Sequence, residues 1–210
     1  RPRFSDAKFF WEQDQKVTLA SRLASLETVV FQKQLGTIAE KVGRMRTLAG
    51  YIAQQSNANV TAAERAAELC KCDLMTDMVG EFPKLQGIMG RYYARHDQEA
   101  GHVALAIEQH YWPRYAGDAT PAEITGQCVA LADRVDTMLG IFAIGQKPSG
   151  VKDPFGLRRA ALGIIRIMIE NNLALNLKDL LQQASTAYGD KLNTADFVEE
   201  VIEYIFDRLK

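Results

Sequence analysis

Apolar residues recur along the chain at intervals of three and four, and no run of useful length alternates in the way typical of β-strands. Turn and capping residues separate these periodic stretches. The pattern predicts an all-α fold with helices over residues 8–12, 18–30, 37–55, 61–79, 85–95, 99–111, 124–144, 157–170, 177–188 and 195–210.

Capping residues set several of these boundaries. Thr61 and Glu64 have the spacing of a capping box, in which each side chain bonds the backbone amide of the other residue. Asp153 is expected to cap the helix that follows Pro154, and Asn193 to cap the last helix. The helix over 157–170 is the most apolar stretch, so we expect it at the centre of the fold.

The composition is typical of a folded protein and does not indicate a strongly charged binding partner. Hydrophobic residues make up 47% and charged residues 24% of the 210 positions, with a net charge of −1. No apolar run reaches the roughly 20 residues that a membrane-spanning helix needs, so we expect no membrane association. Three cysteines, an odd number, favour reduced thiols and a cytoplasmic location. Both ends look cut, because the chain begins without methionine and stops inside an amphipathic stretch.

Candidate metal ligands are few and badly spaced. The histidines are His96, His102 and His110, and Glu99 with His102 has the Glu-x-x-His spacing of di-iron bundles, but a second copy is missing. Cys70 and Cys72 would point to different faces of a helix. The carboxylate pairs Asp73 with Asp77 and Asp133 with Asp136 could each share a helix face, although such pairs are usually just solvated. We therefore expect no resident metal.

Motifs for nucleotide chemistry are absent from the sequence. No glycine-rich phosphate loop, dinucleotide fingerprint or Gly-x-Ser-x-Gly turn occurs. We expect no catalytic residue and no cofactor in this chain.

A cluster of cations surrounds one predicted helix start. Lys147, Lys152, Arg158 and Arg159 flank the beginning of the helix over 157–170, where free amides and the helix dipole favour an anion. These residues are candidates for binding a phosphate or carboxylate. The alternative is a packing loop whose arginines pair with acidic neighbours.

Several segments, in order along nearly the whole chain, resemble the beta subunit of the tetrameric bacterial glycyl-tRNA synthetase. They are Ser5–Trp11, Leu35–Thr37 with Lys41 and Val42, Lys71–Leu74 through Met78–Phe82, Leu85–Ala94, Leu131–Thr137 and Lys147–Gly163. The resemblance implies a heterotetrameric aminoacyl-tRNA synthetase in which an alpha subunit activates glycine with ATP and magnesium, while the beta subunit recognises tRNA-Gly. It implies that this chain is a middle region of the beta subunit, working in the cytoplasm with tRNA-Gly and the alpha subunit as partners and without DNA or membrane partners.

This region is also similar to the helical HD phosphohydrolases, which bind metal through histidines and aspartates. Cys72 and Asp73 stand where a His-Asp pair would be, and Asp133 matches the closing aspartate, so the resemblance implies a vestigial site. It implies opening helices over 1–35, an HD-like helical bundle over 36–172 and flanking C-terminal helices over 173–210 that lead toward an anticodon-binding domain. Two alternatives stay open: a structural spacer without RNA contact, and a residual metal phosphohydrolase using Asp73, Asp77 and Asp133.

Overall fold

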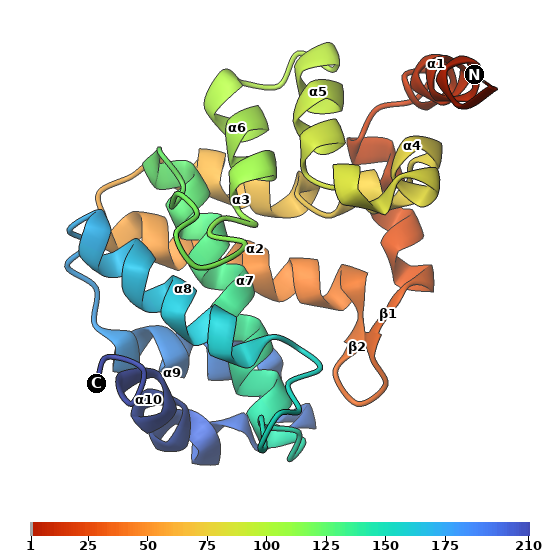
Figure 1. Cartoon of the computed structure of the whole chain (residues 1–210). Coiled ribbons are helices and arrows are strands. Elements are labelled where there is room, and N and C mark those ends of the chain that lie inside the picture. Colours follow the sequence, from red (N-terminus) through yellow and green to blue (C-terminus); the bar gives the residue numbers. More distant parts are fainter. Residues whose placement is uncertain (1) are drawn as a thin grey trace.

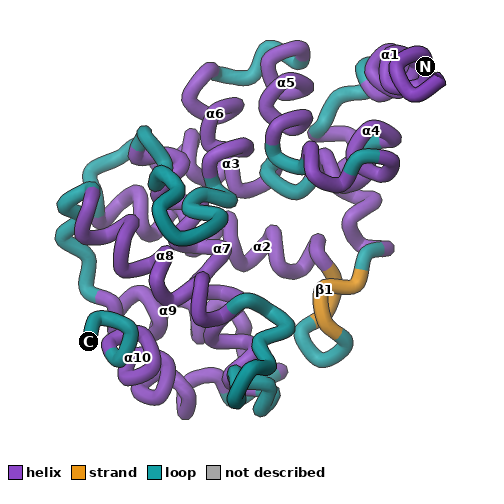
Figure 2. The backbone as a smooth tube through the Cα atoms, viewed as in Figure 1, coloured by secondary structure: helices purple, strands orange, loops and turns teal. Residues whose placement is uncertain are grey.

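Helices account for nearly all regular structure in the computed structural model, which describes residues 2–210, with side chains from Ser5 on (Figure 2). The all-α prediction is confirmed. The α-helices are α1 (Pro2–Asp14), α2 (Ile38–Gln55), α3 (Val60–Leu69), α4 (Asp77–Glu81), α5 (Ile88–His96), α6 (Gly101–Gln109), α7 (Ile124–Ala143), α8 (Leu157–Glu170), α9 (Leu177–Tyr188) and α10 (Val198–Phe206). Short 3-10 helices are η1 (Ala20–Thr28), η2 (Cys72–Met75), η3 (Pro83–Leu85), η4 (Gly189–Lys191) and η5 (Thr194–Phe197).

A small hairpin was not expected from the sequence. Strand β1 (Val30–Gln32) pairs antiparallel with β2 (Gly36–Thr37), directly before α2. Thr37 then caps α2 with a true capping box: the Glu40 amide donates to the Thr37 hydroxyl at 3.2 Å, and the Thr37 amide donates to the Glu40 carboxylate at 2.8 Å.

The predicted helix over 61–79 is wrong as a single element. The chain instead forms α3, η2 and α4, and Asn59 rather than Thr61 caps α3 by accepting from the Ala62 amide at 3.0 Å. Thr76 starts α4 as a separate helix, since its hydroxyl donates to the Asp73 carbonyl and accepts from the Val79 amide.

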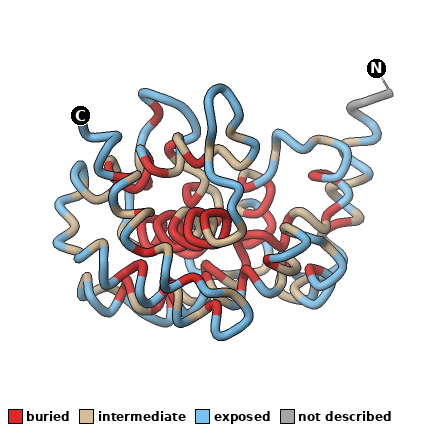
Figure 3. The backbone as a smooth tube through the Cα atoms, turned by 90° about the horizontal axis from the view of Figure 1, so that it is seen from below, coloured by how far each residue is buried: buried red, intermediate tan, exposed pale blue. Residues whose placement is uncertain are grey.

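Helix α7, and not α8, occupies the centre. It packs against α2, α3, α6, α8, α9 and the C-terminal helices, and Figure 3 shows the buried backbone gathered in the middle of the molecule. Helix α8 lies at the surface, since Leu162 and Ile169 are 38% and 62% exposed. The apolar spacing of α8 was read correctly as helical, but its outer face is solvated.

The outer helices extend the bundle in two directions. Helices α1, α4 and α5 lie at one end with the N-terminus, while α9, α10 and the C-terminus lie at the other (Figure 1). The bounds predicted for α8 and α9 are confirmed, whereas the last predicted helix is split into η5 and α10. Asn193 does not cap that helix, because its side-chain amide donates to the Asp196 carboxylate.

Candidate functional site

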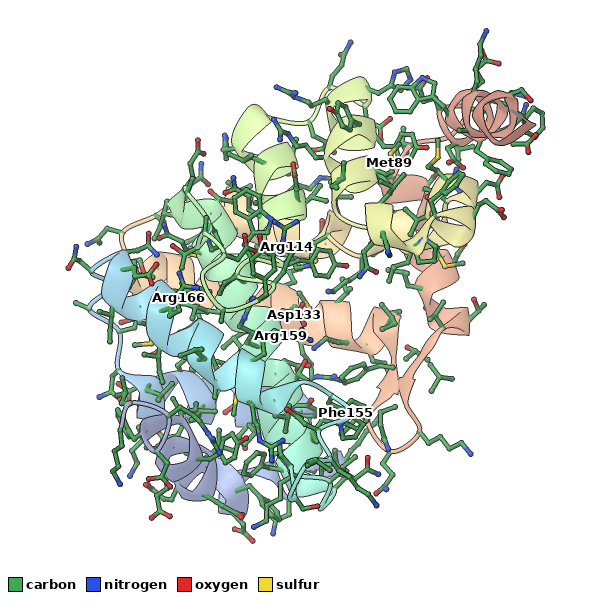
Figure 4. The ribbon with its side chains drawn as sticks, in the orientation of Figure 1. Met89, Arg114, Asp133, Phe155, Arg159 and Arg166 are labelled. Carbon is green, nitrogen blue, oxygen red and sulfur yellow. The ribbon has the colours of Figure 1, made fainter. Side chains whose placement is uncertain are left out.

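A cleft opens between the loop after α6, one face of α7 and the start of α8. Its volume is about 400 Å³. Cationic, aromatic and a few acidic side chains form its wall, and Figure 4 shows Arg114, Asp133 and Arg159 gathered in this part of the fold. The lining residues are Lys84, Gln86, Ile88, Glu108, His110, Tyr111, Trp112, Pro113, Arg114, Asp133, Arg134, Thr137, Phe155, Gly156, Arg159 and Ala160.

Arg134 on α7 holds the loop that forms one wall of the cleft. Its guanidinium donates at 2.8–3.2 Å to backbone carbonyls of His110, Ala130, Tyr111, Trp112 and Pro113. No carboxylate of the described side chains lies within ion-pairing distance of it. Burial lowers the pKa of Arg134 to about 10, and the nearby Arg159 adds to this effect against the opposing attraction of Asp133.

The neighbouring cations are only partly neutralised. Arg159 donates to the carbonyl of Arg114 at 3.3 Å and makes no ion pair among the described residues. Arg114 pairs with Asp118 at 2.8 Å and lies over the Trp112 ring at 5.4 Å. Gly156 lets the chain turn beside Arg159, because its φ is +65° and a Cβ there would lie 3.0 Å from the guanidinium.

The two acidic residues of the cleft wall are already paired. Glu108 bonds Arg91 at 2.7 Å, and Asp133 bonds Lys71 at 2.8 Å and Lys41 at 3.0 Å. Both carboxylates of the cleft wall are therefore neutralised by ion pairs. Four cations line the cleft, namely Lys84, Arg114, Arg134 and Arg159, and they leave it electropositive.

A buried ionic network lies behind the cleft and joins α2, α7 and the segment after α3. The Lys71 ammonium is 2.8 Å from Asp133 and 3.0 Å from the Nε2 of His110, and it lies over the Tyr111 ring at 4.3 Å. Lys41 bridges Asp133 to Asp136 at 3.0 and 2.9 Å, and Arg44 bonds Asp136 at 2.6 Å.

The protonation states in this network follow from burial and neighbours. The pKa of His110 falls to about 3 because burial and the Lys71 ammonium both oppose a second charge. The neutral imidazole therefore donates from Nδ1 to the Ile107 carbonyl at 2.6 Å and accepts from Lys71 at Nε2. Burial alone would raise the pKa of Asp133, but Lys71 and Lys41 outweigh it and hold that pKa well below its usual range.

The positions similar to the HD motif do not meet at one point. The Asp73 carboxylate accepts from the amides of Gly87 and Gly90 at 2.6 and 3.0 Å, and the Cys72 thiol donates to the Glu68 carbonyl at 3.5 Å. Burial raises the pKa of Asp73 to about 6 and that of Cys72 to about 12. Across residues 2–210, no three His, Cys, Asp or Glu side chains gather as a metal site would require.

The other candidate ligands from the sequence are accounted for separately. His96 and His102 are exposed, His110 belongs to the buried network, and Asp77 is exposed on α4. The Cys70 thiol is buried and donates to the Ala67 carbonyl at 3.2 Å. Glu99 pairs with Arg65 at 2.5 Å rather than sharing a site with His102.

The four predicted anion-binding cations spread over the start of α8. Arg159 reaches the cleft, Arg158 donates to the Gly150 carbonyl at 2.5 Å, Lys147 pairs with Glu200, and Lys152 is exposed. Asp153 caps α8 as predicted, accepting from the amides of Leu157 and Arg158 at 2.8 and 3.0 Å. An anion at this helix start would have to displace that carboxylate. The cationic side chains of the segment are therefore available to bind an anion, and its backbone amides are not.

Sequence reasoning missed Arg114 and Arg134. Arg134 lies inside the segment Leu131–Thr137 that carried the family resemblance, but its role depends on carbonyls more than 20 residues away in the chain. Only a prediction that this face of α7 meets the loop after α6 would have connected them.

Comparisons with known proteins agree on one family. Curated relatives called glycine–tRNA ligase beta subunit are 54% identical in Aeromonas salmonicida, 54% in Aeromonas hydrophila and 52% in Edwardsiella ictaluri, each over 100% of this chain and 30% of the relative. These relatives are aminoacyl-tRNA synthetase subunits. The sequence model of the family described as glycyl-tRNA synthetase beta subunit matches residues 1–210, and the chain belongs to that family.

No helix within the described part of the chain has the length and apolar character needed to cross a membrane.

Proposed function

We propose that this chain is one part of a longer glycine–tRNA ligase beta subunit and that it positions tRNA-Gly while the alpha subunit carries out the chemistry. Family membership and the names of relatives that extend well beyond the aligned 30% support this role. In this proposal ATP and magnesium act on the alpha subunit, and the tetramer works in the cytoplasm. The chain contributes binding and assembly.

The observation that carries the proposal is the electropositive cleft with the cations beside it. Arg134 and Arg159 lack a carboxylate partner among the described residues, and Lys152 and Arg158 lie on the adjoining surface. Protein–RNA affinity comes largely from cations that neutralise phosphates and release counterions. A surface with unpaired arginines beside a cleft fits that requirement despite the net charge of −1.

The first test reverses two surface charges in the complete synthetase. We expect Lys152→Glu with Arg158→Glu to raise the KM for tRNA-Gly roughly 10-fold or more, because phosphate contacts are lost. Each lost contact should also lower the salt dependence of binding by about one unit. Glycine-dependent ATP–pyrophosphate exchange should stay unchanged, because it needs no tRNA contact.

Fluorescence-anisotropy titration with tRNA-Gly and an unrelated tRNA at two salt concentrations gives the direct affinity. The matched control is Lys178→Glu with Lys210→Glu, which reverses two exposed cations that pair with Glu199 and Asp207 and do not line the cleft. Unchanged tRNA kinetics in the Lys152 and Arg158 variant would contradict the RNA role of this surface and favour a structural spacer.

The residual phosphohydrolase has no support from the arrangement around Asp133. The Lys71 ammonium already lies against the Asp133 carboxylate, which such a metal would need together with Asp73 and Asp77. Manganese-dependent phosphodiesterase activity in the purified protein would overturn this view.

A further inference from the structure

We propose that the cleft between α7, α8 and the loop after α6 binds one unpaired nucleotide, with Arg159 on its phosphate and Trp112 and Phe155 against its base. The inference deepens the proposed tRNA role by assigning a chemical class to the cleft itself. The shared chemistry is a nucleoside monophosphate, supplied either by an unpaired position of RNA or by a free nucleotide.

Electrostatics calls for an anion at this place. Arg134 is partly buried, donates its hydrogen bonds to backbone carbonyls, and has Arg159 as its like-charged neighbour. Carbonyls occupy both Nη groups of Arg134, so the free donors come from Arg159, whose planar fork suits a phosphate. A phosphate bound to Arg159 would relieve the repulsion between the two arginines, which the attraction of Asp133 for Arg134 offsets only in part.

Aromatic side chains supply the second half of the site. Trp112 and Phe155 are half-buried in the cleft wall. Tyr111 is less suited to stacking, since the buried Lys71 lies over its ring at 4.3 Å and His110 packs against it at 3.9 Å between ring centres, whereas the Arg114 guanidinium over Trp112, at 5.4 Å, belongs to an exposed residue. Base–aromatic stacking tolerates any base, so the site favours a nucleotide over a bare phosphate without choosing a sequence.

Size restricts the ligand to a single unit. A volume of about 400 Å³ lies at the low end of the roughly 300–1,000 Å³ of small-ligand sites and excludes a duplex. The wall is also preformed, because the carbonyl bonds of Arg134 fix the backbone that carries Tyr111 and Trp112. An RNA would therefore have to present a nucleotide outside its paired stems.

The test measures tRNA-Gly binding to the complete synthetase by anisotropy over a range of salt. Trp112→Ala should weaken binding roughly 5- to 100-fold without changing the salt slope, because it removes stacking and no charge. Arg159→Gln should weaken binding and lower the slope by about one. The matched control on the same helix is Arg166→Gln, which removes a charge paired with Glu170 outside the cleft and should leave affinity unchanged.

Mononucleotides distinguish the two sources. Calorimetry with AMP, CMP, GMP, UMP and inorganic phosphate detects the free ligand: binding that is lost in Trp112→Ala supports a free-nucleotide site, and weakened tRNA binding without mononucleotide binding supports an RNA nucleotide. Trp112→Phe, which keeps an aromatic ring, should restore most affinity and guards against misfolding of the alanine variant.

The inference is overturned if Trp112→Ala and Arg159→Gln both bind tRNA normally and no mononucleotide binds. That result leaves the tRNA role intact when the Lys152 and Arg158 variant is still impaired. If the Lys152 and Arg158 variant also binds tRNA normally, the tRNA role is rejected as well.

Discussion

At the scale of a single residue, Asp73 shows how the chain handles a buried carboxylate. Its Oδ2 accepts two amides, from Gly87 and Gly90, while its Oδ1 is buried without a hydrogen-bond partner among the described atoms. Glycine at position 90 allows this approach, since a Cβ there would lie 3.0 Å from the carboxylate. Two amides do not fully offset the burial of a charge, and the pKa of Asp73 therefore rises to about 6.

Asp73 should make stability fall as pH rises. Between its unfolded pKa of about 3.8 and its folded pKa of about 6, the folded state binds the proton more tightly, so stabilisation present at pH 4 is lost by pH 7. Asp73→Asn removes this titration. We expect the Asp73→Asn variant to become more stable relative to wild type as the pH rises from 4 to 7. The relative increase in unfolding free energy, measured by urea denaturation, should reach up to about 3 kcal/mol.

The control is Asp77→Asn, which removes an exposed carboxyl instead of a buried one. Parallel profiles for Asp73→Asn and wild type would show that folding does not raise the pKa of Asp73.

At the scale of an element, α1 is fastened through its last residue. The buried Asp14 carboxylate accepts from the amides of Asp77 and Met78 at 2.8 and 3.0 Å and from the Tyr93 hydroxyl at 2.7 Å. One side chain thus caps α4 and ties α1 to α5. Trp11 completes the contact by stacking on Tyr93 at 5.4 Å between ring centres.

Removing this carboxylate should loosen α1. Asp14→Ala leaves two amides and a hydroxyl without a partner, and we expect a loss of roughly 2–4 kcal/mol of unfolding free energy. Denaturation followed by Trp11 fluorescence reports it. Glu12→Ala removes an exposed carboxylate from the same helix and should change stability by less than about 0.5 kcal/mol. Equal effects of the two variants would contradict the anchoring role.

Helix prediction succeeded where local rules decide and failed where distant contacts do. The bounds of α8 and α9 follow from nearby signals, as with Asp153 before α8. The central position of α7 was missed because Asp133, Arg134 and Asp136 make its sequence look half polar. Those charges are satisfied by groups such as Lys41, 95 positions from Asp136, and no periodicity reveals such a pairing.

The residues of the candidate site were likewise predicted only where a local signal identified them. Arg159 was predicted from the cluster of cations around a helix start, which is a local signal. Arg114 and Arg134 join it only because α6, α7 and α8 meet, and that meeting is a property of the tertiary fold. Asp153, which was read correctly as a cap, is also what occupies the amides that had suggested an anion.

At the scale of the whole molecule, one continuous core joins the parts. Leu26, Leu139, Leu181 and Val201 belong to the same buried cluster, although they come from different segments of the three-part division predicted over 1–35, 36–172 and 173–210. That division itself stays a prediction.

A continuous core should unfold cooperatively. Trp11 and Trp112 lie in different parts of the fold, so the single-tryptophan variants Trp112→Phe and Trp11→Phe report on each part alone. We expect their fluorescence transitions in urea to coincide with each other and with the loss of helical circular dichroism. Transitions at clearly different urea concentrations would contradict a single folding unit.

The Lys71 ammonium, held between Asp133 and His110, changes what the network can respond to. A metal ion in that position would obey mass action, and its occupancy would vary with supply, competition and chelation. The Lys71 side chain is covalently part of the chain, so its presence at this position does not depend on the concentration of a free ion. The Asp133 carboxylate therefore has its counter-charge in every folded molecule, whatever the supply of metal ions.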